Sequence, residues 1–324
     1  MRNLHREAAI WSLFTSDEFF EAAAKECEQT MTWFGSIAIS KHVVNFGRNN
    51  QIFDTFKSLA RDFRRGAEMA KLDDYKLVWD TARCLRGDIR GMMEQPLHSW
   101  MSESEYQEFS RVRIGRVMGY ARPINRALHN AMVGAENFFN PSPNYPERIN
   151  DDDGFPGNEI VEVYDAYANL YKESLARKIP DPLPEYRVDT SVSCRTGDEV
   201  PWTGVWFPET GLEYHSLTFA VKGLRMQPVY RIVKTKEEAE VEGASLPTLE
   251  TVAVATSWHP LILSGHQAEV NRELWAKAGQ PCPKAGIWQP TDPGAAQRTY
   301  EAGEKMLHLG SPYGFTMWRW IADR

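Results

Sequence analysis

Two stretches of this chain repeat each other, and this repeat constrains the fold more than any other feature of the sequence. Residues 197–208 read GDEVPWTGVWFP and residues 279–290 read GQPCPKAGIWQP, so both follow G-x-x-x-P-x-x-G-x-W-x-P. Proline presets an extended backbone, and the glycine before the tryptophan permits a turn that other residues resist. The pattern therefore predicts two related small β modules. The motif residues are Gly197, Pro201, Gly204, Trp206 and Pro208 in the first copy, and Gly279, Pro283, Gly286, Trp288 and Pro290 in the second.

The similarity continues beyond the motif. Phe219 with residues 223–226 (GLRM) resembles Tyr300 with residues 303–306 (GEKM). We expect each copy to close with an aromatic-Arg strand, at residues 230–232 in the first and 318–320 in the second. The second copy is then expected to insert the loop HLGSPYGF before that strand.

Cys282 in the second copy could indicate a metal loop, a reactive thiol or a rigid turn. It aligns with Val200 in the first copy, and a metal or thiol role would not survive that replacement. The alignment favours a buried structural residue. The other cysteines, Cys27, Cys84 and Cys194, are scattered without a CxxC pair, which is typical of a reducing compartment.

The first half of the chain has helical periodicity, with apolar residues near three- and four-residue spacing. Thr15 and Glu18 fit a capping box at the first long helix, and Ser102 begins a later one. We expect a break or kink at Pro123. The predicted helices cover residues 15–34, 50–71, 73–95, 102–139 and 159–177.

The second half has short segments typical of β-strands. The Pro-rich segment at residues 180–187 is interpreted as a linker between the two domains. Short β-like runs follow, separated by turn residues, and one more helix is expected at residues 267–278. The predicted fold class is α+β: an α-helical domain at residues 1–180, then a β-rich region at 181–324. The repeat within that region spans about 194–234 and 279–322.

Composition excludes some classes of function. The formal net charge is −7, so the basic excess of a nucleic-acid binder is missing. No apolar stretch has the length of a membrane span or of a signal peptide's apolar region. We expect a cytoplasmic protein that binds neither nucleic acid nor membrane.

Metal and catalytic motifs are missing from the sequence. The eight histidines form no HExxH pattern, and the NDDDG run at residues 150–154 fails as a calcium loop because Ile149 and Ile160 occupy ligand positions. An acidic turn that caps the next helix is the simpler interpretation. No G-x-S-x-G, P-loop or G-x-G-x-x-G motif occurs, although a triad assembled from distant residues stays open. We expect no metal and no cofactor.

The tryptophans of the repeat divide into two kinds. Trp206 and Trp288 occupy equivalent positions and are expected in the core. Trp202 aligns with Lys284 and is better placed to be exposed, where tryptophan is a favoured interface anchor.

The last 130 or so residues also resemble the immunity proteins of bacterial polymorphic toxin systems, which are often encoded beside Rhs-type or other type VI secretion effectors. The resemblance rests on C-P-x-x-G-x-W at residues 282–288, Gly-Glu with Met at 303–306, and Y-G-x-x-x-W-x-W at 313–320. Family members often have proline after the Met, where this chain has Leu307. The resemblance implies a non-enzymatic cytosolic inhibitor that binds a cognate toxin domain of a secreted effector and occludes its active site. The candidate contacts are Asp151, Asp152, Asp153, Asp198, Glu199, Trp202 and Glu209.

Two other functions stay open from the sequence. One is an enzyme, a hydrolase that reverses a toxin's modification, which predicts a deep pocket with perturbed polar groups. The other is a peptide- or glycan-binding module that uses exposed aromatic residues of the β repeats.

Overall fold

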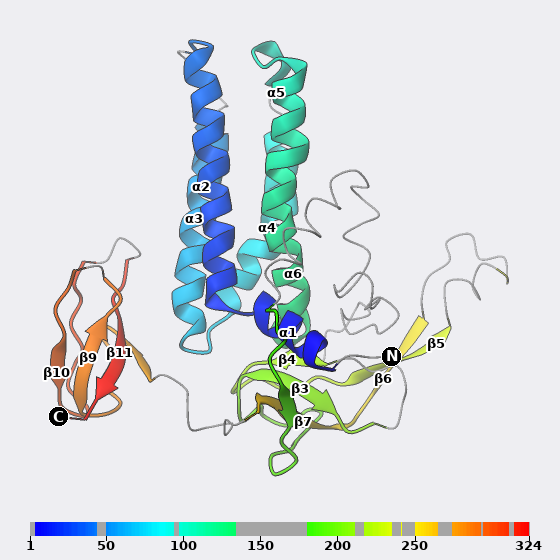
Figure 1. Ribbon diagram of the computed structural model, residues 1–324, viewed down its shortest axis with the longest axis vertical. Helices are drawn as coiled ribbons and strands as arrows, with labels where there is room; N and C mark the ends of the chain where they lie inside the picture. The colour runs from blue at the N-terminus through cyan, green and yellow to red at the C-terminus, as the bar shows by residue number, and fades with distance from the viewer. Residues whose placement is uncertain are drawn as a thin grey trace.

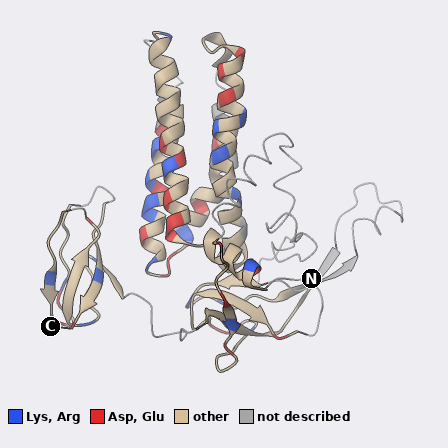
Figure 2. Cartoon of the chain, in the orientation of Figure 1, with Lys and Arg blue, Asp and Glu red and all other residues tan. Residues whose placement is uncertain are grey.

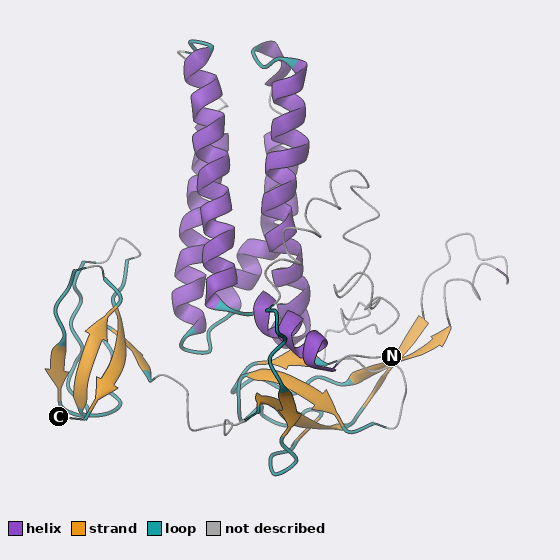
Figure 3. Ribbon diagram, in the orientation of Figure 1, coloured by secondary structure: helices purple, strands orange, loops and turns teal. Residues whose placement is uncertain are grey.

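A computed structural model describes residues 4–43, 50–93, 97–133, 180–210, 217–234, 241, 250–264, 274–292, 294–310 and 314–323. Helices fill the described part of the N-terminal region, and antiparallel sheets fill that of the C-terminal region (Figures 1 and 3). The predicted α+β class with two small β modules is confirmed. The expected helix at residues 159–177 and the acidic run at 150–154 lie outside the described residues.

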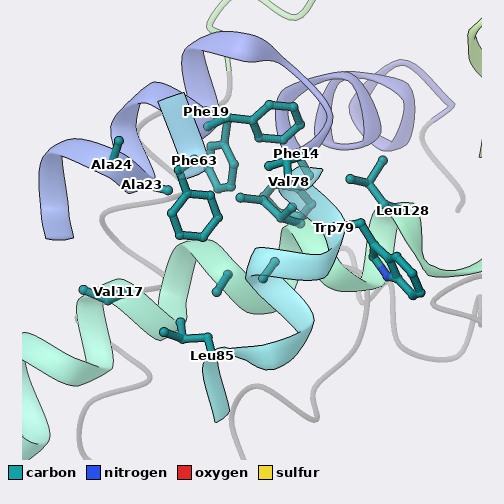
Figure 4. Close-up of a cluster of buried hydrophobic side chains, with 14 of the residues drawn as sticks. Phe14, Phe19, Ala23, Ala24, Phe63, Val78, Trp79, Leu85, Val117 and Leu128 are labelled. Atoms are coloured by element: carbon teal, nitrogen blue, oxygen red, sulfur yellow. The ribbon is translucent and has the colours of Figure 1, made fainter. Parts of the chain in front are cut away.

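Four long helices form an antiparallel bundle that rises from the first β module (Figure 1). Their buried side chains, with Phe19, Phe63 and Val117 among them, meet in one apolar core (Figure 4). The short helix α1 (Leu4–Phe14) was not among the predicted helices. It lies between this bundle and the sheet of the first β module. The bundle helices are α2 (Asp17–Ser40), α3 (Asn50–Ala70), α4 (Lys76–Met93) and α6 (Ile114–Val133), and the shorter elements between α4 and α6 are η2 (Leu97–Ser99), α5 (Glu103–Gln107) and η3 (Glu108–Arg113).

The helix starts follow local capping chemistry. Ser102 forms the predicted capping box with Glu105 at the start of α5. At α2, however, the N-cap is Ser16 and not Thr15: the Ser16 hydroxyl accepts a hydrogen bond from the Phe19 N–H. Thr15 is engaged by the preceding helix, since its hydroxyl donates to the Trp11 carbonyl at 2.8 Å.

Of the break or kink expected at Pro123, the break is wrong, because Pro123 lies inside α6. Its neighbours Ala121 and Ile124 are buried in the bundle core, so tertiary packing keeps the helix continuous. The irregular helical turn in this part of the chain is η3, which precedes α6. It is a π-helix, and its residue Phe109 is buried in the core.

The first β module is a five-stranded antiparallel sheet in the order β1-β7-β3-β4, with β2 also pairing with β7. A separate hairpin, β5 with β6, is inserted between β4 and β7. The strands are β1 (Tyr186–Val188), β2 (Cys194–Arg195), β3 (Gly204–Pro208), β4 (Thr218–Ala220), β5 (Val229–Lys234), β6 (Glu250–Val254) and β7 (Ser257–Leu263).

The second β module is a four-stranded sheet in the order β10-β9-β11-β8. The helix expected at residues 267–278 is wrong at its end, because β8 pairs there with β11, with Trp275 opposite Arg319. Residues 265–273 lie outside the described residues. The strands are β8 (Trp275–Lys277), β9 (Gly286–Pro290), β10 (Arg298–Tyr300) and β11 (Met317–Ala322).

The two modules repeat the same backbone hydrogen bonds. The Gly197 N–H donates to the Met226 carbonyl at 2.8 Å, and the Gly279 N–H donates to the Met306 carbonyl at 2.8 Å. Val200 donates to the carbonyl of Leu224 at 2.8 Å. Its counterpart Cys282 donates to the carbonyl of Glu304 at 2.7 Å, which places Cys282 at the position of Val200.

The closing strand of the second copy is the expected one, since residues 318–320 lie in β11, whereas that of the first copy differs from the expected one. Trp258 of β7 pairs with Pro208, as Trp318 of β11 pairs with Pro290, so β7 is the counterpart of β11. Residues 230–232 belong instead to the inserted β5–β6 hairpin, and the larger insertion is therefore in the first copy.

Two further positions explain this pairing. The indoles of Trp258 and Trp318 are fully buried and make equivalent hydrogen bonds, to the carbonyls of Gln227 and Leu307 at 2.9 and 3.0 Å. The counterpart of Tyr300 is Ala220 and not Phe219, as the register opposite Gly204 and Gly286 shows.

The modules differ in how they are packed. Val205, Phe219 and Leu261 of the first module belong to the same apolar cluster as the bundle helices. The buried carboxylate of Glu7 in α1 accepts a hydrogen bond from the Leu217 N–H at 2.8 Å, next to β4. The second module has an apolar core of its own, built around Trp288 and Trp318.

Candidate partner-binding surface

Each module starts its central strand at a glycine that no other residue could replace without a clash. A Cβ at Gly286 (φ +145) would lie 2.4 Å from the carbonyl oxygen of Ala322 and 2.5 Å from the indole nitrogen of Trp320. At Gly204 the obstacle is the Trp202 ring, 2.2 Å away. Glycine is therefore required at these two positions by the close approach of an indole, and at Gly286 also by the backbone of β11.

The motif tryptophans are structural. Trp206 and Trp288 are fully buried, and their indole N–H groups donate to the carbonyls of Trp202 and Lys284, both at 3.1 Å. Each bond closes the turn in front of its own strand, so this tryptophan holds the turn and the sheet together.

Trp202 is half-buried. Its ring lies over Gly204 and 5.9 Å from the ring of Trp206, at the edge of the first module's inner core. In the second module Lys284 takes its place, and its ammonium lies 3.6 Å from the ring centre of Trp320. Trp202 therefore has a packing role and still reaches solvent.

The thiols of the two modules are buried. Cys282 donates a hydrogen bond to the Lys284 carbonyl at 3.0 Å, and burial raises the pKa of its thiol. Burial also raises the pKa of Cys194 to about 11, so neither sulfur is present as the reactive thiolate near neutral pH. Among the described residues no group of three or more His, Cys, Asp and Glu side chains could hold a metal ion.

The acidic candidates of the first module lie at one end of its sheet. Asp198 and Glu199 are exposed and follow β2, and Glu209 is exposed and follows β3. The ends of these two strands meet at the start of β7, because Arg195 pairs with Ser257 and the Glu209 N–H donates to the carbonyl of Ser257 at 2.7 Å. The pairing brings the three carboxylates to the same end of the sheet.

Two basic groups border this acidic end. The carboxylate of Glu209 lies 3.6 Å from Nε2 of His259, whose Nδ1 lies 2.8 Å from the Val192 carbonyl. The Arg225 guanidinium donates to the Gly197 carbonyl at 3.1 Å.

The second module lacks this acidic end. Its hydrogen-bonding counterparts of Asp198, Glu199 and Glu209 are Gln280, Pro281 and Thr291. Thr291 makes the same backbone bond as Glu209, from its N–H to the carbonyl of Met317 at 2.9 Å. The module fold therefore does not require carboxylates at these positions. The other acidic candidates, Asp151, Asp152 and Asp153, lie outside the described residues.

A cavity of about 260 Å³ lies where the second module meets the base of the bundle. None of the predicted site residues lines it. Lys71 lies at its edge, with its ammonium 2.9 Å from the Glu68 carboxylate and 3.7 Å from that of Asp17. The lining residues are Thr15, Ser16, Asp17, Ala70, Lys71, Tyr75 and Trp275.

The sequence did not predict that Lys71 and Trp275 meet, because no motif contains either residue and they lie far apart in the chain.

Comparison with protein-family models, curated proteins and solved structures finds no match for this chain. No helix in the part of the chain that the structure describes has both the length and the apolar character needed to cross a membrane.

Proposed function

We propose that this protein is an immunity protein, which binds the toxin domain of a secreted effector in the cytoplasm and neutralises it by stoichiometric occlusion of the active site. The resemblance of residues 282–320 to such proteins supplies the class. The acidic end of the first module supplies the candidate contact surface.

One observation carries the choice of surface. Asp198, Glu199 and Glu209 are exposed carboxylates at positions where the second module, with the same hydrogen bonds, has Gln280, Pro281 and Thr291. Charge that a fold does not require is available for recognition, and a carboxylate cluster complements a basic partner surface. Trp202, whose ring lies over Gly204 at the start of β3 and so at the other end of that strand from Glu209, is a separate, partly exposed aromatic candidate.

Charge reversal in matched pairs tests the surface. The effector toxin domain encoded beside this gene is co-expressed with the chain carrying Asp198→Lys and Glu209→Lys, or with the control carrying Gln280→Lys and Thr291→Lys. We expect the first variant to lose protection and to bind the purified toxin domain at least tenfold more weakly, and the control to do neither. Equal binding by both variants would remove the acidic end from the proposal.

Stoichiometry separates occlusion from the alternatives. An occluding inhibitor protects only near one molecule per toxin molecule, measured by titrating the purified chain into the toxin reaction. Protection at far lower ratios would favour an enzyme that reverses the toxin's modification. No binding to the toxin domain, with retention on a peptide or glycan array, would favour a general binding module.

A further inference from the structure

The second β module presents two aromatic side chains that are not part of its own core. That core is formed by residues such as Trp288, Tyr300 and Trp318. Trp275 on β8 and Phe315 just before β11 lie outside this cluster, and yet Phe315 is only 4% exposed. Trp275 is half-buried, so the contacts of both rings lie outside the module's own apolar cluster.

Two cations of the helical region contact these rings. The ammonium of Lys71, the residue after α3, lies 4.5 Å from the ring centre of Trp275. The guanidinium of Arg65 within α3 lies 5.4 Å from the ring centre of Phe315, which also has Lys277 of its own module at 4.8 Å. Both are within the range at which a cation is attracted to an aromatic face.

Lys71 is held in position for this contact. Its side chain is 18% exposed, and the carboxylates of Glu68 and Asp17 lie 2.9 and 3.7 Å from its ammonium. A fixed lysine loses little rotamer freedom when the indole of Trp275 covers it, which favours docking.

The joint is otherwise poorly filled. The cavity lies directly beside Lys71 and Trp275, and no buried side chain among the described residues of the second module belongs to the bundle core. The first module, in contrast, shares that core through Val205, Phe219 and Leu261. An interface that lacks a shared apolar core behaves like a transient one.

We propose that the second β module is an independently folded arm, that the pair Lys71–Trp275 and Arg65–Phe315 (the clasp) holds it on the bundle, and that it leaves and returns as a unit. Each clasp contact is weak alone, so both can break while the two cores stay intact. This inference does not depend on the identity of any partner.

Distance measurement in the full chain tests the clasp. Cys84 on α4 is exposed while Cys27, Cys194 and Cys282 are buried, so it takes a spin label in the native protein. A second label is placed through Thr299→Cys on the exposed part of β10. Pulsed electron paramagnetic resonance then gives the distribution of distances between bundle and arm.

The parent is expected to show a dominant narrow distance component. Trp275→Leu with Phe315→Leu, and separately Arg65→Met with Lys71→Met, should lose that component and broaden the distribution. The control Arg61→Met with Lys57→Met, on exposed residues of the same helix, should retain it. Survival of the narrow component in both clasp variants, its loss in the control, or its absence from the parent would overturn the proposal.

A second measurement tests whether the arm leaves as a folded unit. The indole N–H groups of Trp288 and Trp318 are hydrogen-bonded inside the module, to the carbonyls of Lys284 and Leu307. In the clasp variants we expect both to stay protected from hydrogen exchange. Loss of their protection would mean that the module folds only when docked, which contradicts an independent arm.

Discussion

The two β modules have the same turn, the same buried tryptophans and the same backbone hydrogen bonds, but their outer faces meet different surroundings. In the first module Phe219 is buried, with its ring 5.1 Å from that of Tyr75 in the helical region. The second module has Thr299 at this position, and Thr299 is exposed. The residues that face inward form the core that both modules share, and the residues that face outward determine whether a module packs on the helical bundle.

This difference also separates the functions we assign to the modules. The first is fixed on the bundle and carries the acidic end, so its candidate contact surface is held rigidly. The second is joined through ring–cation contacts at the base of the bundle (Figure 2 shows the charged residues of both signs along it). Each prediction below compares equivalent positions of the two modules, from the largest expected effect to the smallest.

Removing the motif tryptophan should have the largest effect. Trp206→Ala and Trp288→Ala each delete a fully buried indole and should lower the free energy of unfolding by about 3–5 kcal/mol. Trp206 lies in the first module's inner core, but its neighbour Val205 on β3 belongs to the bundle core, so only Trp206→Ala should also disturb the packing of the helices. Denaturant unfolding followed by the helical circular dichroism signal measures this, and equal shifts in both variants would contradict separate cores.

The outer-face pair should give the next effect. Phe219→Ala removes a ring that packs on Tyr75 and should cost about 3 kcal/mol of bundle stability. Thr299→Ala changes an exposed residue and should stay within about 0.5 kcal/mol. Thermal unfolding of the two variants tests the comparison, which fails if Thr299→Ala destabilises as strongly as Phe219→Ala.

The strand glycines should respond differently to rescue. Gly204→Ala and Gly286→Ala should each cost about 1–3 kcal/mol through overpacking. Trp202→Leu should relieve part of the cost of Gly204→Ala, because the obstacle there is a side chain. No side-chain change should relieve Gly286→Ala fully, since it meets the backbone oxygen of Ala322. The free energies of unfolding of the single and double variants test whether the cost at Gly204 is relieved while the cost at Gly286 is not.

Exchange of the aligned core residues should have a small effect. Cys282→Val and Val200→Cys are near volume-conserving changes at buried, equivalent positions and should each cost less than about 1.5 kcal/mol. Toxin protection should be unchanged in both variants. Loss of protection in Cys282→Val alone would restore a chemical role for the thiol.

The smallest effect concerns alkaline pH. The pKa of Cys194 is raised by burial to about 11, so the folded state favours the protonated thiol. Its stabilising contribution is present below the ordinary thiol pKa of 9.0 and is lost as the pH rises through about 11. Cys194→Ala, which introduces the residue that the second module has at position 276, should flatten the decline of stability over this range. An unchanged alkaline profile would contradict the raised pKa.

Periodicity and the repeat predicted much of the fold. The helices of the N-terminal region, the turn with its glycine and tryptophan, and the alignment of Cys282 with Val200 all follow from local spacing, because buried positions recur with the period of the element. The candidate acidic positions were also visible in the sequence. Their arrangement at one end of the sheet became clear only when Arg195 and Glu209 were seen to meet the same residue of β7.

The predictions that were wrong concern features that contacts between distant parts of the chain determine. Residues 230–232 resemble the closing strand in letters, but Trp258, beyond the inserted hairpin, makes the indole bond that closes the module. Pro123 is a helix breaker by local rules, and packing around it keeps α6 continuous. Similarity between short segments compares residue types only. The residue that closes the module is the one that can be buried with its polar group hydrogen-bonded.

The sequence by itself determined that this chain pairs a helical region with a repeated β module, because periodicity and turn chemistry act over a few residues. Only the tertiary structure decided that one copy shares the bundle's core while the other meets it through Lys71 with Trp275 and Arg65 with Phe315. These contacts join residues about 200 and 250 positions apart. No local pattern records such a meeting, because it depends on how the whole chain packs.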